Sequence, residues 1–82
     1  MDPVARTESQ LANALRRYRK QANLTQAELA SAAQKRQATI SRLENAEGAS
    51  LDTLFAVLSA LNLELIVRAR HQGSVSDLED LF

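Results

Sequence analysis

The chain has 82 residues, enough for one small domain, and its formal net charge is zero. It has no cysteine, which excludes disulfides and thiolate metal sites, and no apolar run or N-terminal pattern typical of a membrane span or a secretion signal. We therefore expect a cytoplasmic protein with no membrane partner, and its many Leu and Ala residues favour small packed helices.

A first helix is predicted to begin at Thr7, where the T-x-x-Q spacing to Gln10 indicates a capping box. Apolar residues then recur with helical spacing and are expected to face the core: Leu11, Leu15, Tyr18 and Ala22. A second capping box, formed by Thr25 and Glu28, predicts another helix start. Its buried face continues through Leu29, Ala30 and Ala33.

The segment Gln34 to Arg36 interrupts this periodicity, and a third helix is predicted from Gln37 to Asn45, anchored by Ile40 and Leu43. Ser50 is expected to cap a fourth helix from Leu51 to about Leu61. Its predicted core face consists of Leu54, Phe55, Leu58 and Leu61. Two short helices with a tight connection, the second opening on long polar side chains, are typical of a helix-turn-helix that enters a DNA major groove.

The distribution of charge supports nucleic acid as the partner. Between Arg16 and Arg42 the chain has seven Lys or Arg residues and one acid, Glu28, which gives seven minus one, or +6. The acids Asp77, Glu79 and Asp80 lie in the last twelve residues, which contain no Lys or Arg. The neutral total therefore hides a basic segment suited to a phosphate backbone. The basic cluster at residues 16–20 is either a solvated helix face or a source of phosphate contacts.

After Asn62 the period changes to two, with β-branched residues at the centre of the segment 63–70, which predicts a strand. The residues expected to form this strand are Leu63, Leu65, Ile66 and Val67. A lone strand cannot satisfy its own backbone groups, so we expect the same strand of a second copy to pair with it in a homodimer. A helix that continues through Ala69 is the alternative.

Residues 1–70 are expected to form the domain, and residues 71–82 a flexible acidic tail that ends on Leu81 and Phe82. The tail is either a solubilising end or a docking peptide whose Leu81 and Phe82 enter an apolar pocket on a partner. With one histidine and no cysteine, the chain offers no nucleophile with an adjoining base and no metal site. We therefore expect no enzymatic activity, no catalytic residues and no cofactor.

Four segments, QLANALRRYRKQ, LTQAELA, QATISRLEN and LNLELIVRA, resemble the Cro/C1-type (XRE) helix-turn-helix family, and most closely the HipB-like antitoxins. The resemblance covers residues 7–70. It implies a mainly α, lambda-repressor-like bundle of four to five helices, with one C-terminal strand that pairs across a homodimer. It also implies a repressor that binds a pseudo-palindromic operator in double-stranded DNA and a HipA-like serine/threonine kinase toxin.

The resemblance further implies roles for individual residues. The positions that match base-reading residues are Arg36, Gln37, Ala38 and Ser41. The positions that match phosphate-contacting residues are Gln26, Thr39 and Arg42. Arg19 and Glu44 match a pair that ties the first helix to the recognition helix.

One position departs from the family pattern. The family usually has glycine where Gln34 stands, because the backbone there is left-handed, and another residue costs about 1 kcal/mol in that conformation. We therefore expect the turn, and with it the tilt of the recognition helix, to differ in detail.

Two other functions fit the same residues. A free-standing phage-type Cro/C1-like repressor would share residues 7–62 without needing a toxin partner. A protein-interaction module that has lost DNA binding would bind DNA weakly, with little dependence on salt.

Overall fold

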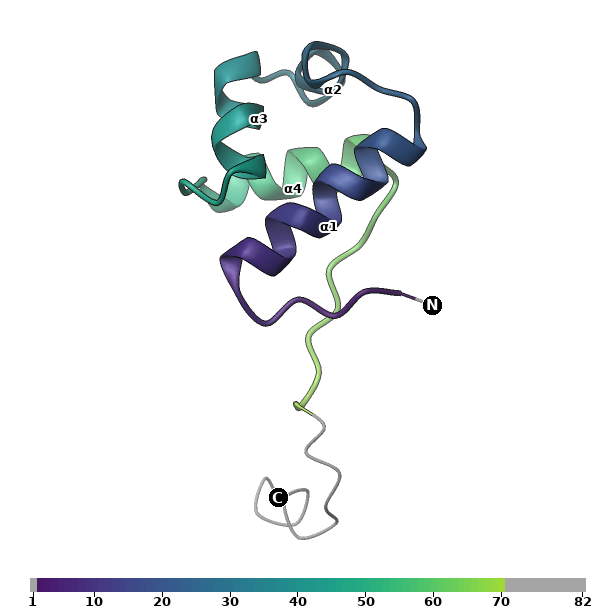
Figure 1. Ribbon diagram of the computed structural model, residues 1–82, viewed down its shortest axis with the longest axis vertical. Helices are drawn as coiled ribbons and strands as arrows, with labels where there is room; N and C mark the ends of the chain where they lie inside the picture. The colour runs from purple at the N-terminus through teal and green to yellow at the C-terminus, as the bar shows by residue number, and fades with distance from the viewer. Residues whose placement is uncertain (1, 71–82) are drawn as a thin grey trace, which may run out of the picture.

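The computed structural model describes residues 2–70, which form four helices and an irregular segment that follows them (Figure 1). The helices are α1 (Glu8–Gln21), α2 (Gln26–Ala33), α3 (Gln37–Glu44) and α4 (Leu51–Ala60). Helix α2 packs against both α3 and α4, and α3 also packs against α1. The predicted mainly helical helix-turn-helix fold is confirmed. The predicted tail, with Leu81 and Phe82, lies outside the described residues.

The predicted helix starts are present, since Thr7, Thr25 and Ser50 are the N-caps of α1, α2 and α4. At α2 the capping box is reciprocal: the Glu28 backbone N–H donates to Thr25 Oγ1 at 3.0 Å, and the Thr25 N–H donates to Glu28 Oε1 at 2.8 Å. At α1 the prediction is only half right. The Gln10 N–H donates to Thr7 Oγ1, but Gln10 Oε1 accepts from the Arg6 N–H instead of returning to Thr7.

Each helix is followed by a residue with positive φ that is not glycine, and these residues are Asn23, Gln34, Ala46 and Asn62. After α2, the Gln34 N–H donates to Ser31 O and the Lys35 N–H to Ala30 O, the two hydrogen bonds of a Schellman motif. Gln34 itself has φ 57° and ψ 43°. Gln34 therefore adopts the left-handed conformation in which the family usually places glycine, and a difference in the tilt of the recognition helix stays a prediction.

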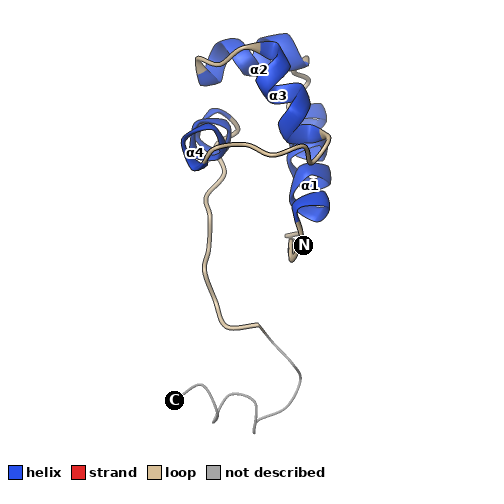
Figure 2. Cartoon of the chain, turned by 90° about the vertical axis from the view of Figure 1, so that its left-hand side faces the viewer, coloured by secondary structure: helices blue, strands red, loops and turns tan. Residues whose placement is uncertain are grey.

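The end of α4 excludes one of the two predictions for the segment that follows, and residues 63–70 do not form a strand in the single chain. Asn62 has φ 57°, and the Leu63 N–H donates to Leu58 O at 2.8 Å, which closes the helix with the same motif. A helix continuing through Ala69 is therefore wrong. Residues 63–70 leave the helical body with no strand beside them in the described part of the chain (Figure 2).

The core lies where α2, α3 and α4 meet beside α1. Its buried residues are Leu15, Leu29, Ala30, Ala33, Ile40, Leu43, Val57 and Leu58. Ala30 is the small residue that lets α2 and α3 cross closely. Two predicted core residues are exposed. Ala22 follows the last residue of α1, and Phe55, 51% exposed, lies about 200° around α4 from the fully buried Val57.

Candidate nucleic-acid interface

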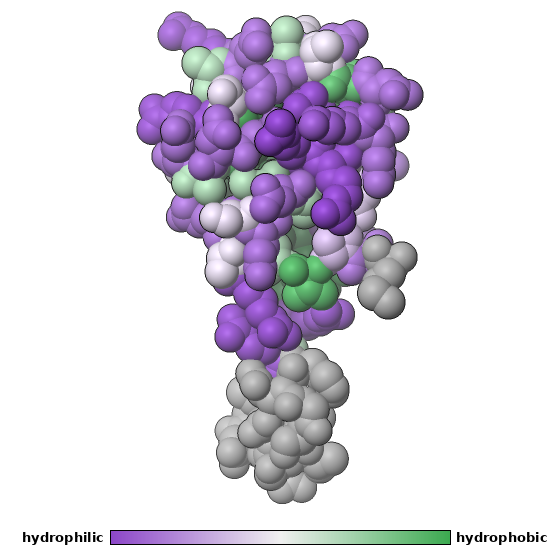
Figure 3. Space-filling model, in the orientation of Figure 1, coloured by the Kyte–Doolittle hydropathy of each residue, from purple (hydrophilic) through white to green (hydrophobic). Residues whose placement is uncertain are grey.

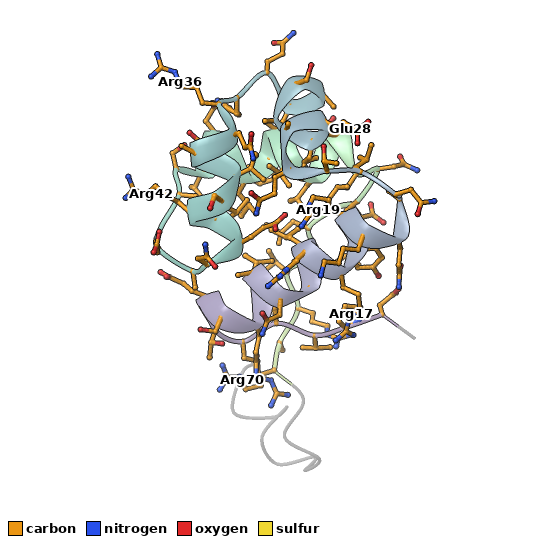
Figure 4. The ribbon with its side chains drawn as sticks, turned by 45° about the horizontal axis from the view of Figure 1, so that its top comes forward. Arg17, Arg19, Glu28, Arg36, Arg42 and Arg70 are labelled. Carbon is orange, nitrogen blue, oxygen red and sulfur yellow. The ribbon has the colours of Figure 1, made fainter. Side chains whose placement is uncertain are left out.

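Helix α3 presents polar residues to solvent because its apolar residues are docked in the core. Ile40 is completely buried and Leu43 nearly so. The predicted base-reading residues lie on the accessible side, with Arg36, Gln37 and Ala38 exposed and Ser41 half-buried. Figure 4 shows Arg36 and Arg42 projecting from α3 on the same side of the molecule. The structure thus brings the predicted base-reading residues together on one helix.

A buried ion pair fixes the position of α3 relative to α1. Arg19 Nε lies 2.6 Å from Glu44 Oε2, and Arg19 Nη2 lies 3.0 Å from Glu44 Oε1. The third nitrogen, Nη1, donates to the Leu24 carbonyl at 2.8 Å, which adds the α1–α2 turn to the same cluster. Arg19 is 8% exposed and Glu44 5% exposed. Loss of one partner would leave a buried charge uncompensated, at a cost of about 3–5 kcal/mol. This predicted pair therefore holds α3 and α1 together beneath the exposed side of α3.

Gln26, a predicted phosphate-contacting residue, is the first residue of α2 and is half-buried. Its Nε2 donates to Glu44 Oε1 at 3.1 Å, a hydrogen bond that the sequence did not suggest. The start of α2 is therefore attached to the end of α3 by the same carboxylate that pairs with Arg19. Backbone N–H groups at a helix start carry partial positive charge, which favours an anion near this position.

The other two predicted phosphate-contacting residues, Thr39 and Arg42, lie along a groove between α3 and the start of α4. The groove is lined by Thr39, Arg42, Glu47, Gly48, Ala49, Ser50 and Thr53. Sequence reasoning missed the loop 47–50. The available signal was Gly48 and the N-cap Ser50, which lie shortly after the recognition helix in the sequence. They indicate a helix start near α3, and the N-terminus of a helix is a natural anion site.

The turn between α2 and α3 is held by a second ion pair, also missed. Lys35 Nζ lies 2.5 Å from Asp52 Oδ2 in the first turn of α4. The hydrogen bond and the positive charge of Lys35 lower the pKa of Asp52. In the capping box of α2, hydrogen bonds from the backbone and side chain of Thr25 lower the pKa of Glu28. Both carboxylates favour the folded state while they are ionised.

The Lys and Arg residues of the basic segment therefore have different partners and face different sides of the molecule. Arg19 is buried in an ion pair, and Lys35 is paired with an acid of α4. Arg36 and Arg42 face the side on which α3 is exposed, whereas Arg17 on α1 points away on the other side of the molecule (Figure 4). The local charge of +6 is thus not one continuous basic surface.

Neither a metal nor a membrane is indicated by the described residues. Residues 2–70 contain no group of three or more His, Asp or Glu side chains placed to hold a metal ion. None of the helices in this part of the chain has the length and apolar character that crossing a bilayer requires.

Comparisons with known proteins agree with this geometry. The helix-turn-helix family model HTH_3 matches residues 15–67. The antitoxin HipB of Escherichia coli O6:H1 is 45% identical over 58 residues, which are 70% of this chain and 62% of that protein. The chain thus spans about three fifths of the length of this curated relative.

Solved structures of HipB are similar along almost their whole chains. The HipB-O4 20mer complex superposes with a TM-score of 0.78 at 36% identity, covering 83% of this chain and 97% of that one. The HipA-HipB-O2-O3 complex superposes with a TM-score of 0.77 at the same identity and coverage. Since the family model matches more than half of the residues, the chain belongs to the helix-turn-helix family and is a relative of the HipB antitoxins.

Proposed function

We propose that this chain is a sequence-specific DNA-binding repressor and an antitoxin of the HipB type. The observation that carries the proposal is the exposed side of α3, which displays Arg36 and Gln37 at its start and is fixed from behind by the buried Arg19–Glu44 pair. A rigid helix with long polar side chains at its N-terminal end is the element that reads base edges in the major groove.

In this proposal the residues divide into two groups. Base edges are read by Arg36, Gln37, Ala38 and Ser41, with the Gln37 amide suited to adenine N6 and N7 and Arg36 to guanine. Phosphates are contacted by Gln26, Thr39 and Arg42, with the groove beside the start of α4 as a further place for the backbone.

Replacement of Gln37 by Ala tests the base-reading group. Operator affinity, measured by fluorescence anisotropy on a duplex from upstream of the chain's own gene, should fall by about 1–3 kcal/mol, or about 5- to 150-fold. Discrimination at one base pair should also relax. Gln21→Ala, at the exposed end of α1, is the matched control and should leave affinity unchanged. If Gln37→Ala bound the operator like the parent chain, the proposed alignment of α3 with the groove would be wrong.

We further propose that residues 63–70 pair as a strand with the same segment of a second copy, through Leu63, Leu65, Ile66 and Val67. Figure 3 shows a small hydrophobic area at the base of the helical body, on a surface that is otherwise mostly hydrophilic. Ile66 and Val67 are 70% and 90% exposed in the single chain, and Leu63 and Leu65 line a groove with Phe55 of α4. Pairing would cover these side chains and satisfy the backbone groups.

Analytical ultracentrifugation of Val67→Asp tests this pairing. The variant should sediment as a monomer at concentrations where the parent chain is a dimer, because the buried carboxylate would oppose association. Arg16→Asp, on the exposed face of α1, should stay dimeric. A monomeric parent chain would refute the proposed pairing.

The partner proposed for this repressor is a HipA-like serine/threonine kinase toxin. The support is the similarity to the HipB chain of the HipA-HipB-O2-O3 complex. We place the DNA-binding and dimerisation domain at residues 1–70 and assign toxin docking to Leu81 and Phe82 of the tail 71–82. Co-purification from the native host, with and without residues 78–82, tests this assignment. Retrieval of a kinase only by the full chain supports it, whereas retrieval of none supports the alternative, a free-standing Cro/C1-like repressor.

A further inference from the structure

The carboxylate of Glu44 has more partners than the ion pair alone requires. Its Oε2 accepts from Arg19 Nε at 2.6 Å. Its Oε1 accepts from both Arg19 Nη2 at 3.0 Å and Gln26 Nε2 at 3.1 Å. Glu44 is 5% exposed, so DNA cannot reach it directly, yet it holds the side chain of a half-buried residue at the interface.

This hydrogen bond determines which end of the Gln26 amide faces outward. A carboxylate can only accept hydrogen bonds, so the amide must turn its nitrogen, and not its oxygen, toward Glu44. That nitrogen carries two hydrogens, and the second is directed away from Glu44. A phosphate oxygen is also only an acceptor, so this second N–H is the group that can bind it.

Arg19 makes this arrangement electrostatically possible. A carboxylate without a counter-charge near a DNA phosphate would repel it. The guanidinium of Arg19 supplies that counter-charge by donating to both carboxylate oxygens of Glu44, and its Nη1 donates to the Leu24 carbonyl. In this arrangement Arg19 serves the carboxylate, since three of its five N–H groups donate within the protein.

We propose that Glu44 is a positioning residue for the phosphate contact of Gln26, whose amide nitrogen bridges the buried carboxylate and a DNA phosphate. The inference rests on the proposed DNA-binding function. It extends the task of the Arg19–Glu44 pair from holding two helices together to orienting a hydrogen-bond donor. Because phosphate contacts carry no sequence information, the effect is the same on any duplex.

A double-mutant cycle on a mixed-sequence duplex of about 20 base pairs tests the proposal. The first background is the parent chain, in which Gln26→Ala should lower affinity about tenfold, as expected for a hydrogen bond to a charged group. The second is the paired variant Arg19→Met with Glu44→Met, which removes both charges together and so leaves neither one buried alone. In that background Gln26→Ala should lower affinity less than about threefold. An equal loss in both backgrounds would overturn the proposal.

A second measurement does not depend on the folding of any variant. Hydrogen exchange of the side-chain amides, followed by NMR in the DNA-free parent chain, should show slowed exchange at Gln26 Nε2 relative to the exposed amides of Gln21 and Gln37. Exchange of Gln26 as fast as theirs would contradict the orientation. If the parent chain failed to bind the duplex, the DNA-binding function would be refuted, whereas the exchange rates would still report on the amide.

Discussion

Replacement of Gln34 by glycine should stabilise the protein, because Gln34 has the left-handed conformation that glycine adopts most easily. Its φ is 57° and its ψ is 43°, and its side chain is exposed in the turn between α2 and α3. A Cβ atom in this conformation approaches the following carbonyl oxygen, which costs about 1–2 kcal/mol. Gln34→Gly removes that cost without removing a buried side chain.

The expected gain is smaller than the strain, because glycine also makes the unfolded chain more flexible. That entropic term costs about 0.4–1 kcal/mol. The middle of the two ranges leaves a net stabilisation of about 0.8 kcal/mol. For a domain of this size, such a change raises the melting temperature by about 3–6 °C.

Thermal unfolding followed by far-UV circular dichroism, at one fixed protein concentration, measures this effect. Gln34→Ala is the matched control, since it removes the same exposed side chain but keeps the Cβ atom. The control should melt close to the parent chain, and Gln34→Gly clearly above it. If the glycine variant melted at or below the alanine variant, the strain assigned to the left-handed turn would not exist.

The capping box of α2 and the Lys35–Asp52 pair give the remaining stability predictions. Thr25→Ala removes the acceptor for the Glu28 N–H and should cost about 1 kcal/mol in urea unfolding, whereas the control Ser31→Ala, on the exposed face of α2, should change stability by less than about 0.5 kcal/mol. The pKa values of Glu28 and Asp52 are both lowered in the folded state, so their stabilisation is present above their unfolded-state pKa of about 4 and is lost as the pH falls through the lower folded values. Unfolding curves measured below about pH 5 should therefore show a stability that falls with pH. The double variant with Glu28→Gln and Asp52→Asn should show a shallower fall. An equally steep fall in the double variant would mean that these two carboxylates do not cause the pH dependence.

The sequence predicted most of the fold because its local signals are strong. The caps Thr25 and Ser50 mark where α2 and α4 begin, and the anchors Ile40 and Leu43 mark the buried face of α3. The prediction that Phe55 lies in the core was wrong because the apolar residues of α4 cover more than one face of the helix. Only the tertiary arrangement selects the face with Val57 as the buried one. Local periodicity cannot make that selection.

The positions of the candidate interface residues on α3 were predicted from the sequence, but the contacts that connect them to other helices were not. The helical spacing of the buried anchors Ile40 and Leu43 left Arg36, Gln37 and Ala38 exposed and Ser41 half-buried on the accessible side of α3. The Gln26–Glu44 hydrogen bond joins residues 18 positions apart, and the Lys35–Asp52 pair joins residues 17 apart. Such contacts depend on how the helices cross, which no pattern within one helix reports.

The salt dependence of DNA binding tests the central claim, that the exposed side of α3 binds a phosphate backbone. In the proposed dimer, Arg42 of both subunits would neutralise about two phosphates, which predicts a slope of log affinity against log salt of about −2. Affinity for the operator duplex should then fall about tenfold between about 50 and 200 mM salt. A slope near zero would contradict the account and would identify the chain as a protein-interaction module that has lost DNA binding.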